Sequence, residues 1–326
     1  MLIWSIIQQR LDLRYTWKIS RNASTEKHNL FVTVSDGSHS GQGEIAPNIR
    51  YGESVADTLA HFDQFVQDNP ETISSVDELR ERIRTYPNSL RFGLESAYLF
   101  YLCHKQGKTL SSLLNLPPPT PIPTSYTLPI MEPGEIGPFI RLHNLDRFSL
   151  LKLKVNQENA VELTRALFAQ YGKPICIDAN EAFKDPETVT RYLEEVSDIP
   201  LLFLEQPLPA REEEAGVFLK TRSPVPIFAD ESVTSNPDMK KIATQFHGIN
   251  MKLMKAGGFL HGIDILKEAG QQGLSTMIGC MIETSLGIRS AMYLTPLCQY
   301  YDLDGMFLLK DEPFNLVKEQ TGYLFL

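Results

Sequence analysis

Three acidic residues each end a short apolar run of the sequence. Asp178 ends ICID, Glu205 ends LLFLE and Asp230 ends PIFAD. If these runs are consecutive parallel strands of a barrel, the three carboxylates point into one small space at its carboxyl end. Desolvated carboxylates repel one another strongly, and a divalent cation held among them removes that repulsion. Because the ligands are hard oxygen atoms rather than His or Cys, the pattern predicts a Mg²⁺ site.

The alternative for any one of these acids is the N-cap of the following helix. Asn180, two residues after Asp178, could be the N-cap instead of Asp178. Three acids at matching positions in successive runs favour the metal site over capping.

Lysines flank the acids on neighbouring runs. Lys152 and Lys154 lie two residues apart in LKLK, so their side chains face the same way, and Lys252 ends the run that follows Asp230. A lysine beside another ammonium group in a barrel mouth has its charged form disfavoured, which lowers its pKa toward the range of a general base. The alternative for LKLK is an amphipathic strand with a solvated face. A third lysine, Lys252, at the end of a neighbouring run makes this alternative less favoured.

Opposed lysines predict a particular reaction. The second and sixth strands of a barrel lie roughly opposite each other, so a substrate carbon between Lys154 and Lys252 faces one amine on each side. A substrate carboxylate would bind to Mg²⁺ and Lys152, and these two positive charges would stabilise the enediolate that it forms when the α-proton leaves. Removal of a proton from one face and its return to the other inverts the centre. The expected reaction is therefore racemisation or epimerisation.

The pattern along the chain changes in a way that could position these residues. Residues 2–44 alternate between apolar and polar, with an Asp36-Gly37 turn, as in an antiparallel meander. Residues 54–107 have helical periodicity, and a proline-rich segment follows at 117–125. Beyond it, apolar runs alternate regularly with helical segments, which predicts an α/β fold with a parallel sheet. The number of repeats favours a closed barrel over a doubly wound open sheet.

The composition argues against several classes of function. The chain has 326 residues, a formal net charge of −9 and a pI of about 5.4. This acidic balance argues against broad binding to nucleic acid or anionic lipid, and we expect neither partner. No apolar stretch is long enough for a membrane span, and we expect a cytoplasmic protein. The cysteines show no CxxC spacing and are expected to be reduced thiols: Cys103, Cys176, Cys280 and Cys298.

Several motifs together resemble a known family. They are LKLKV, IDANEAF, FLEQP, ADES, INMKLMKAGG and GCMIETSLG, with HSGQGEIAP and PTSYTLPI nearer the N-terminus. The chain resembles the muconate-lactonising branch of the enolase superfamily, and within it the dipeptide epimerases of the L-Ala-D/L-Glu type. The resemblance implies an α+β capping domain at 1–120, a (β/α)₇β modified TIM barrel at 121–304, and a C-terminal segment at 305–326 that returns to the capping domain.

The resemblance also implies residue roles. It makes Asp178, Glu205 and Asp230 the Mg²⁺ ligands, Lys154 and Lys252 the paired acid and base, and Lys152 the partner of the substrate carboxylate. The mandelate-racemase branch uses a histidine on the seventh strand, and LSTMIGCMIE contains none.

The segment Asp302-Leu303-Asp304 narrows the range of expected substrates. Two acids spaced by one on an extended segment point to the same side, and an ammonium group is their natural partner. The alternative is a solvated turn before Gly305. In dipeptide epimerases a DxD at this place holds the substrate α-amino group. The same resemblance places Thr127 in the pocket and gives Cys280 and Ile282 backbone contacts to the peptide, although the family often has Ser where Cys280 stands.

The sequence leaves four points open. An o-succinylbenzoate synthase or a muconate-type cycloisomerase would share the metal ligands and lysines, but its substrate has no amine for the DxD. A non-catalytic binding relative would not need to keep the ligands and both lysines. In the capping loop, roughly residues 17–27, Arg21 could pair with an acidic substrate side chain or be structural. Association into a homo-oligomer is open as well.

Overall fold

The computed structural model describes residues 1–68 and 70–326 and is built around an eight-stranded parallel sheet. Its strands follow one another in chain order: β5 (Tyr126–Leu128), β6 (Leu151–Lys154), β7 (Ile175–Asp178), β8 (Leu201–Glu205), β9 (Ile227–Ala229), β10 (Gly248–Lys252), β11 (Ser275–Gly279) and β12 (Tyr300–Asp302). The Ser125 N–H donates to the Tyr301 carbonyl at 3.0 Å, which joins the first strand region to the last. The sheet therefore curves into a barrel, and the open-sheet alternative is wrong.

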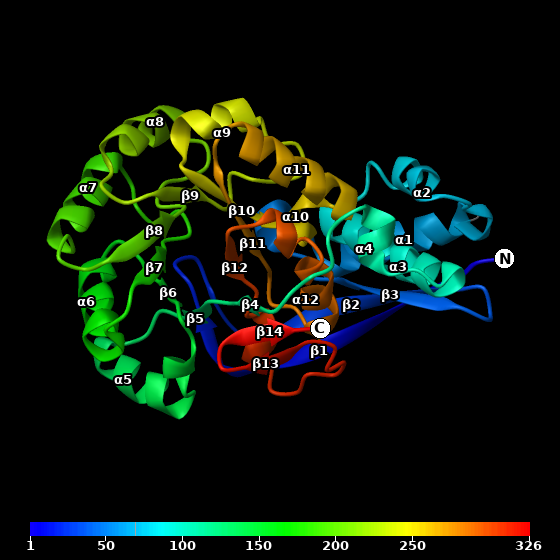
Figure 1. The fold of residues 1–326 in the computed structure, drawn as a ribbon, viewed down its shortest axis with the longest axis horizontal. Helices are drawn as coiled ribbons and strands as arrows, with labels where there is room; N and C mark the ends of the chain where they lie inside the picture. The colour runs from blue at the N-terminus through cyan, green and yellow to red at the C-terminus, as the bar shows by residue number, and fades with distance from the viewer. Residues whose placement is uncertain (69) are drawn as a thin grey trace.

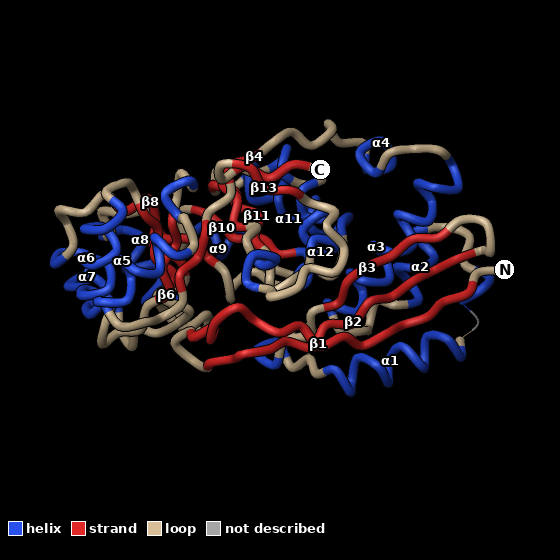
Figure 2. The backbone as a smooth tube through the Cα atoms, turned by 90° about the horizontal axis from the view of Figure 1, so that it is seen from below, coloured by secondary structure: helices blue, strands red, loops and turns tan. Residues whose placement is uncertain are grey.

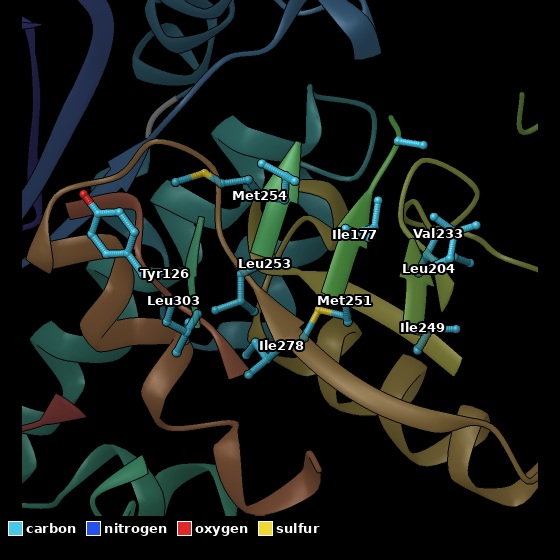
Figure 3. Close-up of a cluster of buried hydrophobic side chains, with 14 of the residues drawn as sticks. Tyr126, Ile177, Leu204, Val233, Ile249, Met251, Leu253, Met254, Ile278 and Leu303 are labelled. Atoms are coloured by element: carbon cyan, nitrogen blue, oxygen red, sulfur yellow. The ribbon is translucent and has the colours of Figure 1, made fainter. Parts of the chain in front are cut away.

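Helices connect the strands and surround them (Figure 1). They are α5 (Pro133–Leu142), α6 (Ala160–Tyr171), α7 (Pro186–Glu195), α8 (Glu213–Arg222), α9 (Met239–Gln245), α10 (Leu253–Ala256), α11 (Phe259–Gln271) and α12 (Ser285–Met292). Side chains such as Ile177, Leu204 and Ile278 leave the strands toward this helical layer and form the main core with it (Figure 3). The predicted (β/α)₇β arrangement is confirmed.

Aromatic residues fill the interior of the barrel below the strand ends. Phe203 and Phe228 stack with their ring centroids 4.5 Å apart, and Cys176 and Met277 complete the cluster. Gly248 makes room for it, because a Cβ there would lie 2.5 Å from Phe228 Cζ. With this part of the interior packed, space for a substrate is left at the carboxyl ends of the strands, where barrel enzymes have their active sites.

A separate antiparallel sheet and, among the described residues, four α-helices form the N-terminal part. The sheet order is β1 (Ile3–Lys18), β2 (Ala23–Ser35) and β3 (Ser40–Ile45), and the helices are α1 (Val55–Gln67), α2 (Val76–Arg82), α3 (Asn88–Gln106) and α4 (Leu110–Leu114). Helix α3 packs directly on β3, since a Cβ at Gly41 would lie 2.1 Å from the Ala97 carbonyl oxygen. Figure 2 shows the long β1–β2 hairpin extending from these helices toward the barrel. The predicted meander and the helical region after it are confirmed.

The C-terminal residues contact both parts. The Lys310 N–H donates to the Asp12 carbonyl on β1 at 2.9 Å. Farther on, β13 (Lys318–Gln320) and β14 (Tyr323–Phe325) form a small sheet with β4 (Ile122–Pro123), which precedes the barrel. The domain boundaries at 120 and 304 stay predictions.

Short 3-10 helices complete the described structure: η1 (Ile49–Tyr51), η2 (Pro70–Thr72), η3 (Leu145–Arg147), η4 (Thr295–Leu297) and η5 (Gly305–Leu308). Among residues 1–68 and 70–326, no helix combines the length and apolar character needed to cross a membrane.

Candidate active site

The three acids predicted to bind a metal lie together at the carboxyl ends of neighbouring strands. Asp178 and Glu205 end β7 and β8, and Asp230 directly follows β9. Each offers a carboxylate oxygen, and these oxygens lie within 4.8 Å of one another. None of the three caps a helix, because α7, α8 and α9 have Asp185, Glu212 and Asp238 at their N-caps. The capping alternative is therefore wrong.

Lysine ammonium groups contact all three acids. Lys154 Nζ donates to Asp178 Oδ2 at 2.5 Å, and Lys252 Nζ donates to Asp230 Oδ2 at 3.0 Å. Lys152 Nζ donates to Glu205 Oε2 at 2.9 Å. In the order of the eight strands, β6 with Lys154 and β10 with Lys252 are four positions apart. The two lysines thus project from opposite sides of the barrel wall.

Burial and nearby charges together lower the pKa of Asp178 and raise that of Glu205. Burial raises the pKa of Asp178, but the ammonium groups of Lys152 and Lys154 outweigh it and hold the pKa below its usual range. Burial and the nearby charge of Asp178 raise the pKa of Glu205 to about 8.

The pKa of Lys252 differs from the sequence-based expectation. Burial lowers it most, and the ammonium of Lys152 also lowers it as expected, but the charges of Asp230, Glu205 and Tyr51 together raise it by more. The pKa of Lys252 is therefore raised well above its usual value, and the expectation of a lowered one is wrong for this arrangement of charges.

The surroundings of the acids fit a hard cation. Asn180 Oδ1 and Glu231 Oε2 are buried acceptor oxygens that find no donor within the described part of the chain. Burial and the charges of Asp230 and Asp178 raise the pKa of Glu231. The cluster thus holds more buried oxygen acceptors than its protein donors satisfy, which is what a cation and its bound waters would need.

Asp302 and Asp304 both face the barrel interior. Asp302 accepts hydrogen bonds from Ser125 Oγ at 2.6 Å and Lys152 Nζ at 2.7 Å, and Asp304 Oδ2 accepts from the Thr127 N–H at 2.6 Å. Their exposed fractions are 5% and 6%, so the solvated-turn alternative is wrong. Burial and the charge of Asp302 raise the pKa of Asp304 to about 6. Burial also disfavours the Asp302 carboxylate, but Lys152 lowers its pKa overall.

A cavity of about 540 Å³ brings most of the predicted residues together. Its lining includes Thr127, Lys154, Asp230, Lys252, Cys280, Ile282, Asp302 and Asp304. Asp178, Glu205 and Lys152 are not in the lining and lie deeper, each at most 1% exposed. The Ile282 carbonyl, a predicted contact to the peptide, already accepts a hydrogen bond from Asn29 Nδ2 at 3.0 Å.

The tip of the β1–β2 hairpin is fastened to the barrel. Arg21 donates to the Asn180 carbonyl at 2.7 Å and forms ion pairs with Glu181 at 3.0 Å and Glu231 at 2.8 Å. Arg50 from η1 pairs with the same Glu181 at 2.8 Å. Arg21 is thus occupied by barrel groups, as the structural reading of this residue expects.

Comparison with known proteins places the chain in a family. A family model described as enolase C-terminal domain-like matches residues 141–312. The chain belongs to the enolase superfamily. An L-Ala-D/L-amino acid epimerase from Pedosphaera parvula is 33% identical over 97% of this chain and 93% of its own. An L-Ala-D/L-Glu epimerase from Escherichia coli is 28% identical over 98% of each chain. This superfamily member is accordingly an isomerase, and the resemblance to the dipeptide epimerase branch is confirmed.

Solved structures of the superfamily superpose closely on the chain. An enolase family member from Agrobacterium tumefaciens, with homology to dipeptide epimerases and with bound sodium and L-Ala-L-Glu, has a TM-score of 0.92 at 27% identity and covers 100% of this chain and 98% of its own. A dipeptide epimerase from Enterococcus faecalis, in complex with Mg and L-Leu-L-Tyr, has a TM-score of 0.88 at 25% identity and covers 99% and 96%.

Sequence reasoning missed several residues that support this superfamily site. Asn250 Nδ2 donates to Glu205 Oε1 at 3.0 Å, and Gly279 leaves the space for it, since a Cβ there would lie 2.4 Å from Asn250 Oδ1. Lys255 Nζ donates to Asp230 Oδ1 at 2.5 Å. Asn250 and Lys255 both stand in the motif INMKLMKAGG, and Asn250 precedes Lys252 by two residues on the same strand face, which was a usable signal.

Proposed function

We propose that this isomerase is a dipeptide epimerase that inverts the α-carbon of the C-terminal residue of its substrate. The observation that carries the proposal is the presence of Asp302 and Asp304 in the same cavity as the opposed Lys154 and Lys252. Two carboxylates at one end of a cavity suit a free α-amino group, and a lysine amine on each side of the other end, one as base and one as acid, suits exchange of an α-proton. The names of the similar epimerases support the same reaction.

We further propose that the metal is Mg²⁺ and that Asp178, Glu205 and Asp230 hold it. Support comes from their oxygen-only ligand set and from the Mg in the Enterococcus faecalis complex. When bound, the cation supplies positive charge that favours the substrate carboxylate as its α-carbon loses a proton.

The chain's own residues have distinct parts in the proposed reaction. Lys154 removes or returns the proton on one face, and Lys252 does so on the other. Lys152 lies beneath the cavity between Glu205 and Asp302, and from there we propose that its ammonium attracts the substrate carboxylate. At the far end, Asp302 and Asp304 orient the α-amino group.

Three more residues are proposed to position the peptide. Thr127 lies beside Asp304 and holds it through its backbone N–H. Cys280 and Ile282 line the cavity next to the same end and would contact the peptide through their backbone. At Cys280 a side-chain part is not needed, because its sulfur already accepts a hydrogen bond from the Gly305 N–H at 3.3 Å.

Incubation in D₂O tests the reaction directly. With Mg²⁺ and a panel of L,L-dipeptides, the enzyme should place deuterium at the α-carbon of the C-terminal residue and produce the L,D-diastereomer. Chiral chromatography and mass spectrometry measure both. A variant lacking both lysines, with Lys154→Met and Lys252→Met, controls for contaminating epimerases. If no dipeptide exchanges while an o-succinylbenzoate synthase or cycloisomerase substrate is turned over, the proposal is wrong.

Asp304→Asn tests the amine site. The variant should lose about 100-fold in kcat/KM on dipeptides, because a buried ammonium loses a charged partner, at a cost of roughly 3 kcal/mol. Asp311→Asn removes the same charge from an exposed position seven residues later and should keep full activity. Steady-state kinetics of both variants on one dipeptide measures the difference in kcat/KM. Unchanged turnover by Asp304→Asn would contradict a substrate amine at this position.

A further inference from the structure

One cationic side chain of the cavity lining finds no partner in the described part of the chain. Lys27 lies on β2 and lines the cavity, yet across residues 1–68 and 70–326 its ammonium makes no ion pair and no side-chain hydrogen bond. The other cationic side chains of the lining are all paired with carboxylates: Arg21, Arg50, Lys154 and Lys252. Lys27 is also partly withdrawn from water, and burial lowers its pKa. An ammonium in this condition gains from an anion that enters the cavity.

Contacts along the hairpin place Lys27 near one end of the cavity. Asn29, two residues away on the same face of β2, donates to the Ile282 carbonyl at 3.0 Å. Leu11, directly opposite Lys27 on β1, packs in one cluster with Ile282 and Leu308. Lys27 therefore lies above the walls that η5 and Ile282, in the segment after β11, contribute.

That end is the one with Asp302 and Asp304. Asp304 directly precedes η5, and the Gly305 N–H contacts the sulfur of Cys280, two residues before Ile282. The opposite end, near Asp230 and Glu231, is covered instead by the hairpin tip and η1. A dipeptide with its amino group on the two aspartates would have its N-terminal side chain at the Lys27 end.

We propose that Lys27 selects the N-terminal residue of the substrate, favouring an acidic side chain and disfavouring a basic one. The inference rests on the proposed dipeptide epimerase function and adds a substrate class to it. A carboxylate on the N-terminal side chain would supply the partner that the ammonium lacks, whereas a second ammonium would add repulsion in a partly desolvated site.

Three dipeptides with N-terminal side chains of similar length test the selection: L-Glu-L-Ala, L-Met-L-Ala and L-Lys-L-Ala. In the unmodified enzyme, kcat/KM should be about 10-fold higher for the acidic than for the neutral dipeptide and lowest for the basic one. In Lys27→Met the acidic-to-neutral ratio should fall to about 1, and in Lys27→Glu the order of acidic and basic dipeptides should reverse. Because each ratio compares two substrates on one protein, a general loss of activity cancels.

Lys18→Met is the matched control. Lys18 is exposed on the same hairpin and is not among the lining residues, so its removal should leave the ratios unchanged. Equal acidic-to-neutral ratios in the unmodified enzyme and Lys27→Met would overturn the inference, and turnover of L-Met-L-Ala would then leave the proposed function standing. An equal change in Lys18→Met would also overturn it, since the effect would then be long-range. Absence of exchange with every dipeptide would instead remove the proposed function and the inference with it.

Discussion

Lys252→Met is expected to abolish epimerisation while keeping proton exchange with one stereoisomer only. Each lysine projects from its own side of the barrel, so in the proposed reaction each would reach one face of the substrate α-carbon. In Lys252→Met, Lys154 should still exchange the α-proton of the diastereomer that presents it to β6. Lys154→Met should show exchange with the opposite diastereomer. Because a positioned acid or base contributes up to about 10⁴-fold, kcat for inversion should fall by about that factor in either variant.

NMR monitors the incorporation of deuterium from D₂O into the L,L-dipeptide and into the L,D-dipeptide in separate reactions. Lys267→Met, at an exposed position on α11, is the control and should keep full inversion. Loss of Lys252 leaves Asp230 with its contact to Lys255, so the variant should fold, and circular dichroism checks this. If either lysine variant still interconverts the diastereomers, or if both exchange the same one, the two-sided mechanism is wrong.

The positions of the proposed metal ligands follow from rules that can be applied to the sequence alone. A parallel strand of a barrel ends at the active-site face, so an acid that closes an apolar run must lie there. The register confirms it locally, since Lys154 pairs with Asp178 and Asp178 pairs with Glu205 across neighbouring strands. The alternation in LKLK similarly fixes that Lys152 and Lys154 share a face.

The hairpin contacts could not be read from the sequence. Arg21 and Arg50 reach Glu181 across 160 and 131 residues of chain, and no periodic pattern relates them. Asn180 and Glu181 also adopt left-handed backbone conformations, with φ of 44° and 65°, which residue type alone does not predict. Such contacts depend on how the hairpin packs against the barrel.

The electrostatic expectation for Lys252 was incomplete for a related reason. The sequence indicated that Lys152 would lie nearby and lower its pKa, and that effect is present. It did not give the 3.0 Å contact with Asp230, which acts in the opposite direction with a larger effect. The sign of a net pKa shift depends on distances among several charges, and strand positions specify these only to within a few ångströms.

Divalent-cation binding is expected to be measurable without any substrate. Protein treated with EDTA should unfold at a higher temperature when Mg²⁺ is added, because a ligand that binds only the folded state at 100 times its Kd stabilises it by about 2.7 kcal/mol. In a chain of this size that corresponds to a rise of a few degrees. The physical source is the gathering of Asp178, Glu205 and Asp230 in a buried site, where burial and the charge of Asp178 raise the pKa of Glu205 to about 8.

Glu205→Gln tests whether that stabilisation belongs to this site. The substitution is isosteric, and the amide oxygen can still accept from Lys152 or Asn250, so the fold should persist. The Mg²⁺-dependent rise in unfolding temperature should disappear, and kcat should fall by about 10³-fold, since the charge that favours the deprotonated substrate is lost. Asp63→Asn, at an exposed position on α1, should retain both. Calorimetric scans with and without Mg²⁺ give the first readout, and an equal rise in Glu205→Gln would place the cation elsewhere.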